Sequence, residues 1–133
     1  MGSVEGAGRI AQSRRSALKA DGMHRVSIGA GGSQPTRILA LGAHADDIEI
    51  GCGGTILRLL EQNPASEVCW VVMGASGRRR AEAVESASRF LANAKRKEII
   101  VKEFRDGYFP YMGAEIKDFF EELKRNSAPD LIL

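Results

Sequence analysis

The stretch Arg37-Ile38-Leu39-Ala40-Leu41-Gly42-Ala43-His44-Ala45-Asp46-Asp47-Ile48-Glu49 decides the fold that this chain is expected to adopt. Its first half is a short apolar run closed by Gly42, which is typical of a buried strand that ends in a turn. Its second half places one histidine and three carboxylates directly behind that strand. Polar, chemically active side chains at this position are typical of α/β proteins, whose parallel sheets bind ligands at the carboxyl ends of their strands.

The alternation of apolar strands and amphipathic helices continues to the end of the chain. Further strands are predicted at 68–73, 99–104 and 130–133, and helices at 55–62, 79–94 and around 116–123. Asn63-Pro64 is expected to end the first helix and Ser127-Ala128-Pro129 the last. This order predicts an α/β fold with a Rossmann-like, mostly parallel sheet flanked by helices and connected by right-handed crossovers.

The bulk composition is that of one globular domain. Among the 133 residues, 44% are hydrophobic and 27% are charged, a balance normal for soluble proteins. No apolar run approaches the ~18 residues of a membrane helix, so no membrane span is expected. Residues 1–36 hold five Lys/Arg and two Asp/Glu, which leaves the remainder nearly neutral. A neutral body lacks the concentrated basic face of nucleic-acid-binding proteins, so no nucleic-acid partner is expected.

Residues 1–36 differ in character from residues 37–133. They contain seven of the fifteen glycines and no sustained apolar periodicity, so a disordered leader or linker is predicted there. The two cysteines, Cys52 and Cys69, belong to no CxxC pair and have small or apolar neighbours. They are expected to be reduced, buried thiols of a cytoplasmic protein.

The cluster of His44, Asp46, Asp47 and Glu49 is the chemically active part of the sequence. Three carboxylates packed so closely repel one another unless they are solvated or paired with a cation. A divalent metal is a natural partner, and zinc accepts mixed histidine and carboxylate ligands. A further carboxylate beside the metal can act as general base. The alternative is an ordinary helix N-terminus, where the helix dipole and free N–H groups favour Asp and Glu.

The full string from His44 to Glu49, with Gly51-Cys52-Gly53-Gly54-Thr55 behind it, resembles the HPDDxE signature of the PIG-L/LmbE family of zinc-dependent deacetylases. The resemblance extends from about Arg37 to Leu133, so 37–133 is expected to be a partial deacetylase domain of this family. It implies that His44 and Asp47 bind Zn2+, that Asp46 is the catalytic base and that Glu49 has a supporting role. The implied substrate is a small-molecule N-acetylated sugar conjugate of the N-acetylglucosamine type or a related amide.

The sequence departs from the family pattern at Ala45, where proline is usual. Proline only restricts the backbone there, so the ligand geometry remains possible with alanine.

Weaker matches to the family lie further along the chain. Arg79 or Arg80 resembles an arginine that opens the family's second helix near the substrate pocket, and Asp106-Gly107 resembles an Asp-Gly near the sugar site. Arg79 and Asp106 are therefore the substrate-binding candidates, against the alternatives of a solvated basic turn and a plain turn. Three aromatic residues lie beside Pro110, namely Tyr108, Phe109 and Tyr111. Their side chains are expected either to stack on a sugar ring or to pack against other residues of the protein.

The family's third zinc ligand is a histidine just after the fourth strand, and this sequence ends at Leu133 before such a residue. The only other histidine is His24, in the predicted leader. The chain is therefore expected to be C-terminally truncated. Because two ligands hold zinc weakly, it is also expected to have little or no activity.

Two rival functions remain open. One is a nucleotide-binding Rossmann module that uses 51–54 as a phosphate loop, although the neighbouring carboxylates would repel phosphate. The other is non-catalytic: either a truncated gene product or a scaffold that pairs an exposed sheet edge with another chain, which in a homo-oligomer is a second copy.

Overall fold

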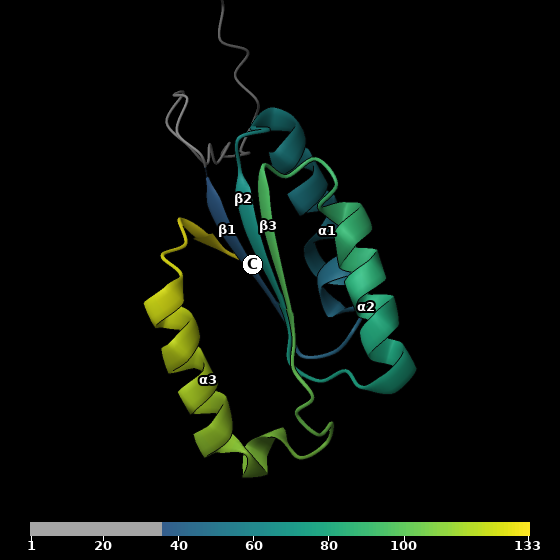
Figure 1. The fold of residues 1–133 in the computed structure, drawn as a ribbon, viewed down its shortest axis with the longest axis vertical. Helices are drawn as coiled ribbons and strands as arrows, with labels where there is room; N and C mark the ends of the chain where they lie inside the picture. Colours follow the sequence, from purple (N-terminus) through teal and green to yellow (C-terminus); the bar gives the residue numbers. More distant parts are fainter. Residues whose placement is uncertain (1–35) are drawn as a thin grey trace, which may run out of the picture.

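Four parallel strands form the sheet, and they are joined in the order β3-β2-β1-β4 (Figure 1). The α/β class and the parallel sheet predicted from the sequence are thus confirmed. In this strand order the chain runs outward from β1 in both directions, so β1 lies at the topological switch point where such sheets bind ligands. The strands are β1 (Arg37–Gly42), β2 (Glu67–Val72), β3 (Arg96–Val101) and β4 (Leu131–Ile132).

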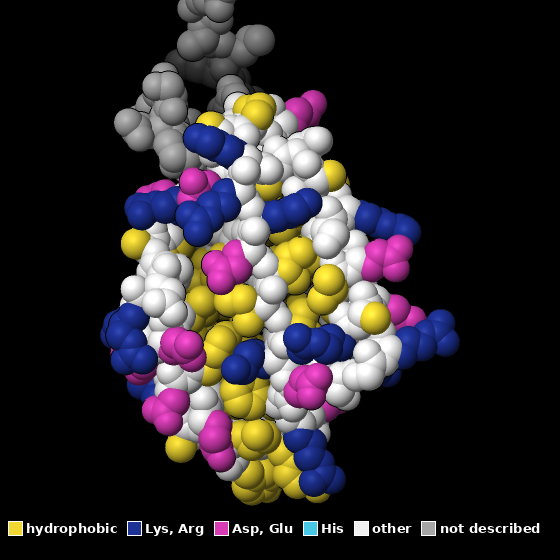
Figure 2. Space-filling model, in the orientation of Figure 1, with side chains coloured by type: hydrophobic (Ala, Val, Ile, Leu, Met, Phe, Trp, Pro, Cys, Tyr) yellow, Lys and Arg dark blue, Asp and Glu magenta, His cyan; other side chains and the backbone are white. Residues whose placement is uncertain are grey.

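The computed structural model describes residues 36–133. The predicted leader or linker at 1–36, with His24, therefore lies outside the described residues except for Thr36, which is buried. Within the described part, no helix is long and apolar enough to cross a membrane. On the face shown in Figure 2, basic and acidic side chains are interspersed.

The helices cover both faces of the sheet. α1 (Asp47–Gln62) and α2 (Gly77–Phe90) lie on one face, and α3 (Gly113–Asn126) lies on the other (Figure 1). A short 3-10 helix, η1 (Phe109–Tyr111), precedes α3. In the chain, α1 follows the carboxyl end of β1 and α2 follows that of β2, whereas η1 lies between β3 and α3.

Side-chain alternation along the strands divides the core into two layers. Ile38 and Trp70 face α1 and α2, whereas Leu39 and Val71 face the opposite way, toward Phe119 of α3. Because both faces are covered, the residues that follow the charged first residue of each strand are apolar, from Ile38 to Leu41 in β1 and from Val68 to Val72 in β2, as expected for a buried parallel sheet.

The glycine-rich segment differs most from the sequence prediction. The first helix was expected over 55–62 after a glycine turn, but α1 begins at Asp47 and includes Gly51, Gly53 and Gly54. A Cβ added at Gly53 would lie 2.7 Å from Cε1 of Phe90 in α2, so glycine here permits close helix packing. The alternative prediction of a phosphate loop over 51–54 is wrong, because these residues lie inside α1. Their backbone N–H groups lie beyond the first turn, where N–H groups are used within the helix and are not free to bind phosphate.

Two smaller differences concern β3 and the cysteines. β3 was predicted over 99–104 but runs from Arg96 to Val101, because its polar first half pairs with β2 as an edge strand. Cys52 and Cys69 are free thiols, but they are half-buried rather than buried. Partial burial raises the pKa of the Cys69 thiol to about 11.

Candidate active site

The loop that contains His44 connects the carboxyl end of β1 to α1. Asp46 is the N-cap residue of α1, and Asp47 and Glu49 lie in its first turn. The helix N-terminus considered from the sequence is therefore the correct local structure. The Asp46 side chain nevertheless makes no capping hydrogen bond and is exposed, so no hydrogen bond to the helix backbone occupies its carboxylate.

His44 and Asp47 lie in direct contact. The backbone N–H of His44 donates to Oδ2 of Asp47 over 2.8 Å, and Nδ1 of the His44 ring lies 3.4 Å from the same oxygen. Nitrogen and oxygen ligands of one tetrahedral zinc ion, each ~2.1 Å from the metal, are separated by ~3.4 Å. The spacing of these two atoms therefore suits two ligands of a single ion.

The other ring nitrogen of His44 contacts Asp106, which is 62 positions away in the chain. Nε2 of His44 lies 2.9 Å from Oδ1 of Asp106. This hydrogen bond is the main cause of the raised pKa of His44, to which the charges of Asp106 and Asp47 add. The same hydrogen bond, followed by one from the Gly107 backbone, lowers the pKa of Asp106.

Gly74, just beyond β2, allows this contact to form. Asp106 follows β3 and His44 follows β1, so the two loops must meet over the end of β2. A Cβ at Gly74 would lie 3.0 Å from the Phe104 carbonyl oxygen and 3.3 Å from that of Ala43. A larger residue would therefore separate the loops that carry His44 and Asp106.

A cavity of about 390 Å³ lies between the first turn of α1 and the side of α2. One of its carboxylate atoms, Oε2 of Glu49, is buried and has no hydrogen-bond partner in the described part of the chain. Such an atom calls for a partner, which a ligand can provide. The cavity is lined by His44, Ala45, Asp46, Glu49, Arg79, Glu82, Ala83 and Ser86.

The structure distinguishes two neighbouring arginines that the sequence left undecided. Arg80 donates to the backbone carbonyl of Val101 and lies 3.7 Å from a carboxylate oxygen of Glu103. Arg79 instead lines the cavity, and its charge makes a minor contribution to the lowered pKa of Asp106, whose main cause is the hydrogen bond from His44. Arg79 is thus the arginine that a ligand in this cavity would meet.

The aromatic residues after Asp106 have separate environments. The Phe109 ring is stacked on the His44 ring, with centroids 6.0 Å apart and planes at 11°. The Arg105 guanidinium lies 3.8 Å above the Tyr108 ring, and Tyr111 is 84% exposed. Phe109 therefore supports the site directly, a role that its position beside Pro110 could not reveal because aromatic packing beside proline is common.

The residues present fit part of a zinc site. Over residues 36–133, no three His, Cys, Asp or Glu side chains gather so that they could hold a metal ion. His44 and Asp47 supply two correctly spaced donor atoms, and Glu49 adds an unsatisfied carboxylate oxygen to the adjoining cavity. The described residues therefore account for two ligands, and a complete catalytic zinc site needs a third.

A second cavity, of about 410 Å³, lies at the other end of the sheet, between the first residues of the strands and the end of α3. Its charged side chains have both signs, and Arg37 is already paired with Asp130. None of the predicted site residues lines it, so the smaller cavity beside His44 is the better candidate.

Comparison with known proteins shows which proteins this chain is similar to. The family model described as PIG-L: GlcNAc-PI de-N-acetylase matches residues 39–133. A solved structure of N,N'-diacetylchitobiose deacetylase from Pyrococcus horikoshii, complexed with its inhibitor MPG, matches with a TM-score of 0.53 and 29% sequence identity. The match covers 73% of this chain and 39% of that chain, so the chain spans less than half the length of that deacetylase.

Proposed function

The chain belongs to the PIG-L (GlcNAc-PI de-N-acetylase) family, and on this premise we propose a zinc-dependent hydrolase that removes an acetyl group from an N-acetylglucosamine-type or related amide. The deacetylase among its structural neighbours supports a deacetylase-type function. The observation that carries the proposal is the position of His44, whose ring contacts Asp47 on one side and Asp106 on the other at the carboxyl end of β1.

His44 and Asp47 are the proposed metal ligands. Their facing atoms, Nδ1 and Oδ2, have the separation that one tetrahedral ion requires. A zinc ion held there supplies Lewis acidity, which polarises an amide carbonyl and makes a water molecule more acidic.

Asp46 is the proposed general base. It lines the same cavity as His44, and its carboxylate makes no cap bond that would have to break first. In this role Asp46 accepts a proton from the attacking water and returns it to the amine nitrogen as the C–N bond breaks. The products are acetate and the free amino sugar.

The substrate is proposed to occupy the cavity between α1 and α2. Arg79 offers N–H donors to a carbonyl or hydroxyl oxygen, and the unpartnered oxygen of Glu49 can accept from a sugar hydroxyl. An uncharged N-acetylated sugar conjugate with several hydroxyl groups would satisfy both residues. Asp106 remains a substrate-binding candidate through the carboxylate oxygen that does not contact His44.

Cytoplasmic location and homo-oligomerisation also remain proposals. Two free thiols support a reducing compartment. β3 and β4 are the two edges of the sheet, and apolar side chains flank β3 in Figure 2. An unpaired edge of this kind is where a second copy could add, and size-exclusion chromatography would detect it.

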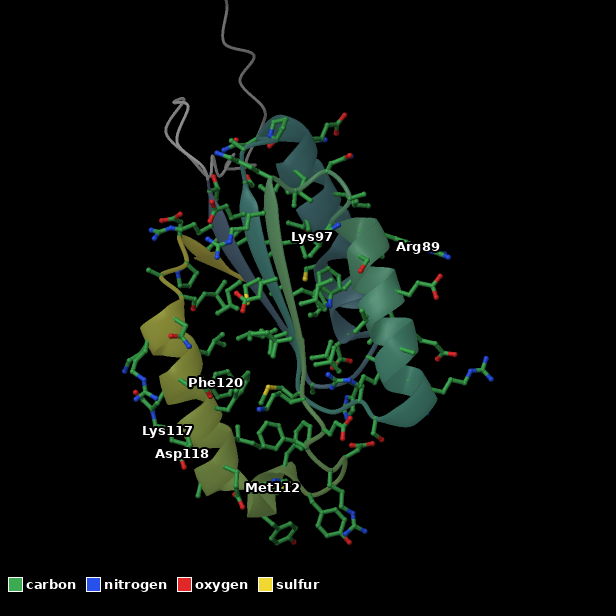
Figure 3. The ribbon with its side chains drawn as sticks, in the orientation of Figure 1. Arg89, Lys97, Met112, Lys117, Asp118 and Phe120 are labelled. Carbon is green, nitrogen blue, oxygen red and sulfur yellow. The ribbon has the colours of Figure 1, made fainter. Side chains whose placement is uncertain are left out.

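The metal part of the proposal is tested by titrating the chain with Zn2+ in a calorimeter. We expect one weak site per chain, lost in His44→Ala and Asp47→Ala but retained in Asp46→Asn. Asp118→Asn is the matched control, because Asp118 lies on the outer side of α3, away from the sheet (Figure 3). Zinc affinities that are equal in all five proteins would contradict the proposed ligands.

The catalytic part is tested by acetate release from N,N'-diacetylchitobiose with excess Zn2+. The expected rate is low, because the described residues supply only two ligands. Asp46→Asn should reduce that rate by about a hundredfold or more, the usual contribution of a general base, while Asp118→Asn should not change it. Zinc-dependent release that survives in Asp46→Asn would exclude Asp46 as the base.

A further inference from the structure

We propose that Asp106 is a positioning residue that keeps the His44 proton on Nε2 and thereby presents Nδ1, beside Asp47, as the metal donor. This inference deepens the proposed function and rests on it, since it assigns a role toward the same metal. It gives Asp106 a task beyond the substrate contact expected from the sequence.

The first support is the pair of distances around the His44 ring. Nε2 lies 2.9 Å from Oδ1 of Asp106, whereas Nδ1 lies 3.4 Å from Oδ2 of Asp47. An ionised carboxylate can only accept, so the nitrogen at hydrogen-bonding distance must carry the proton. Because a neutral imidazole has a single N–H, Nδ1, the nitrogen that faces Asp47, then has a free lone pair with which it can bind a metal ion.

Asp106 is itself held in place, which a positioning role requires. It lies in a turn that is closed by the Tyr108 N–H, which donates to the Arg105 carbonyl over 3.1 Å. Gly107 has a φ of +75°, a left-handed conformation that glycine adopts without steric cost. The Asp-Gly pair therefore forms a turn that fixes the backbone of Asp106 relative to the end of β3.

Phe109 restricts His44 independently of Asp106. Its ring is stacked on the His44 ring at an interplanar angle of 11°, and it packs against the core layer that contains Phe119. Phe109 therefore limits tilting of the imidazole, while Asp106 decides its rotation and its protonated atom.

The consequence follows from the general behaviour of metal-binding histidines. A carboxylate that accepts the second N–H of such a histidine fixes its tautomer and orientation and increases its basicity, and loss of the carboxylate typically reduces metal affinity by about 10- to 100-fold. In this chain the carboxylate comes from a loop two strands away from the proposed ligands.

The test is ¹⁵N NMR of the histidine rings in the metal-free chain. The sequence has two histidines, so a His24→Gln variant assigns the His44 signals. Spectra are recorded at about pH 9.5, roughly three units above the ordinary histidine pKa of ~6.5, where the ring is neutral. A short unstructured peptide with one histidine gives the tautomer ratio of an unconstrained ring.

We expect His44 to be more strongly biased toward the Nε2–H tautomer than the reference peptide. Asp106→Asn should raise the Nδ1–H fraction by about threefold or more, because an amide can donate as well as accept. Glu103→Gln is the matched control: it removes a charge three positions away that contacts Arg80 instead of His44. A proton on Nδ1 in the unmodified chain, or the same tautomer ratio in all three proteins, would overturn the proposal.

Zinc affinity is the second readout. Asp106→Asn should weaken Zn2+ binding by about 10- to 100-fold, whereas Glu103→Gln should leave it unchanged. Equal zinc affinity in Asp106→Asn and the unmodified chain would overturn the metal-presenting role. If the unmodified chain binds no zinc, the proposed function fails, and the tautomer measurement still decides whether Asp106 controls His44.

Discussion

Gly53 of α1 lies against the ring of Phe90 in α2, so closely that a Cβ at Gly53 would be 2.7 Å from Cε1 of that ring. The Phe90 ring in turn packs on Trp70, with centroids 5.7 Å apart, and Trp70 is fully buried. The ring therefore has little room to move. Absence of a side chain at Gly53 lets α1 approach α2, and the cavity of the candidate site lies between these helices.

Gly53→Ala and Gly54→Ala should change stability in opposite directions. Both residues are in α1, but nothing lies within 4 Å of a Cβ at Gly54. Gly54→Ala should stabilise the chain by about 0.5–1 kcal/mol through backbone entropy. In Gly53→Ala the clash, roughly 1–3 kcal/mol, should exceed that gain. Urea unfolding followed by the fluorescence of the single tryptophan measures both, and stabilisation by both variants would contradict the packing argument.

Substitution of Arg80 should lower the stability of the chain, whereas substitution of Arg79 should weaken ligand binding. Arg80→Ala removes a hydrogen bond to the Val101 carbonyl and should cost about 0.5–1.5 kcal/mol of unfolding free energy. Arg79→Ala should change stability by less than about 0.5 kcal/mol, as is usual at an exposed position. It should instead weaken N-acetylglucosamine binding, measured by NMR titration. Equal effects of the two variants on binding would refute the assignment of Arg79 to the cavity.

The His44–Asp106 pair should make stability depend on pH. The pKa of His44 is raised, chiefly by its hydrogen bond to Asp106, so its contribution is complete below the ordinary value of 6.5 and is lost as pH rises through the raised pKa. The pKa of Asp106 is lowered, chiefly by the same bond, so its contribution is present above the ordinary value of 3.8 and is lost as pH falls through the lowered pKa.

Both contributions are therefore present between those two ordinary values, at about pH 5. Urea unfolding at about pH 5 and about pH 9 should show a larger stability difference between the unmodified chain and Asp106→Asn at the lower pH. The difference should be small, because both side chains are substantially exposed and screened. An equal difference at both pH values would argue against the ion pair.

Asp130 should hold β4 against the start of β1. Its carboxylate accepts from the backbone N–H of Arg37 at 2.9 Å and from the Arg37 guanidinium, and its own N–H donates to the Arg37 carbonyl. Asp130→Asn should accelerate hydrogen exchange of the Leu133 N–H, which bonds to the Leu39 carbonyl. Asp118→Asn is the control, and unchanged Leu133 exchange in Asp130→Asn would rule out this role.

The sequence by itself determined the features that depend on residues close together along the chain. The apolar run from Ile38 to Leu41 specifies a buried strand, and the order of elements specifies a parallel sheet with helices on both faces. The His44, Asp46 and Asp47 side chains are brought together within one loop and one helical turn, so their proximity follows from their spacing.

Only the tertiary structure decided which side chains from distant parts of the chain lie beside the loop that carries His44. Asp106 reaches His44 because the order β3-β2-β1 and the absence of a side chain at Gly74 let two loops meet over β2. Arg79 rather than Arg80 faces the cavity because of the rotation of α2 about its axis against β3. The physical reason is that spacing along the chain fixes contacts within a turn, whereas contacts between distant segments depend on how the strands and helices pack.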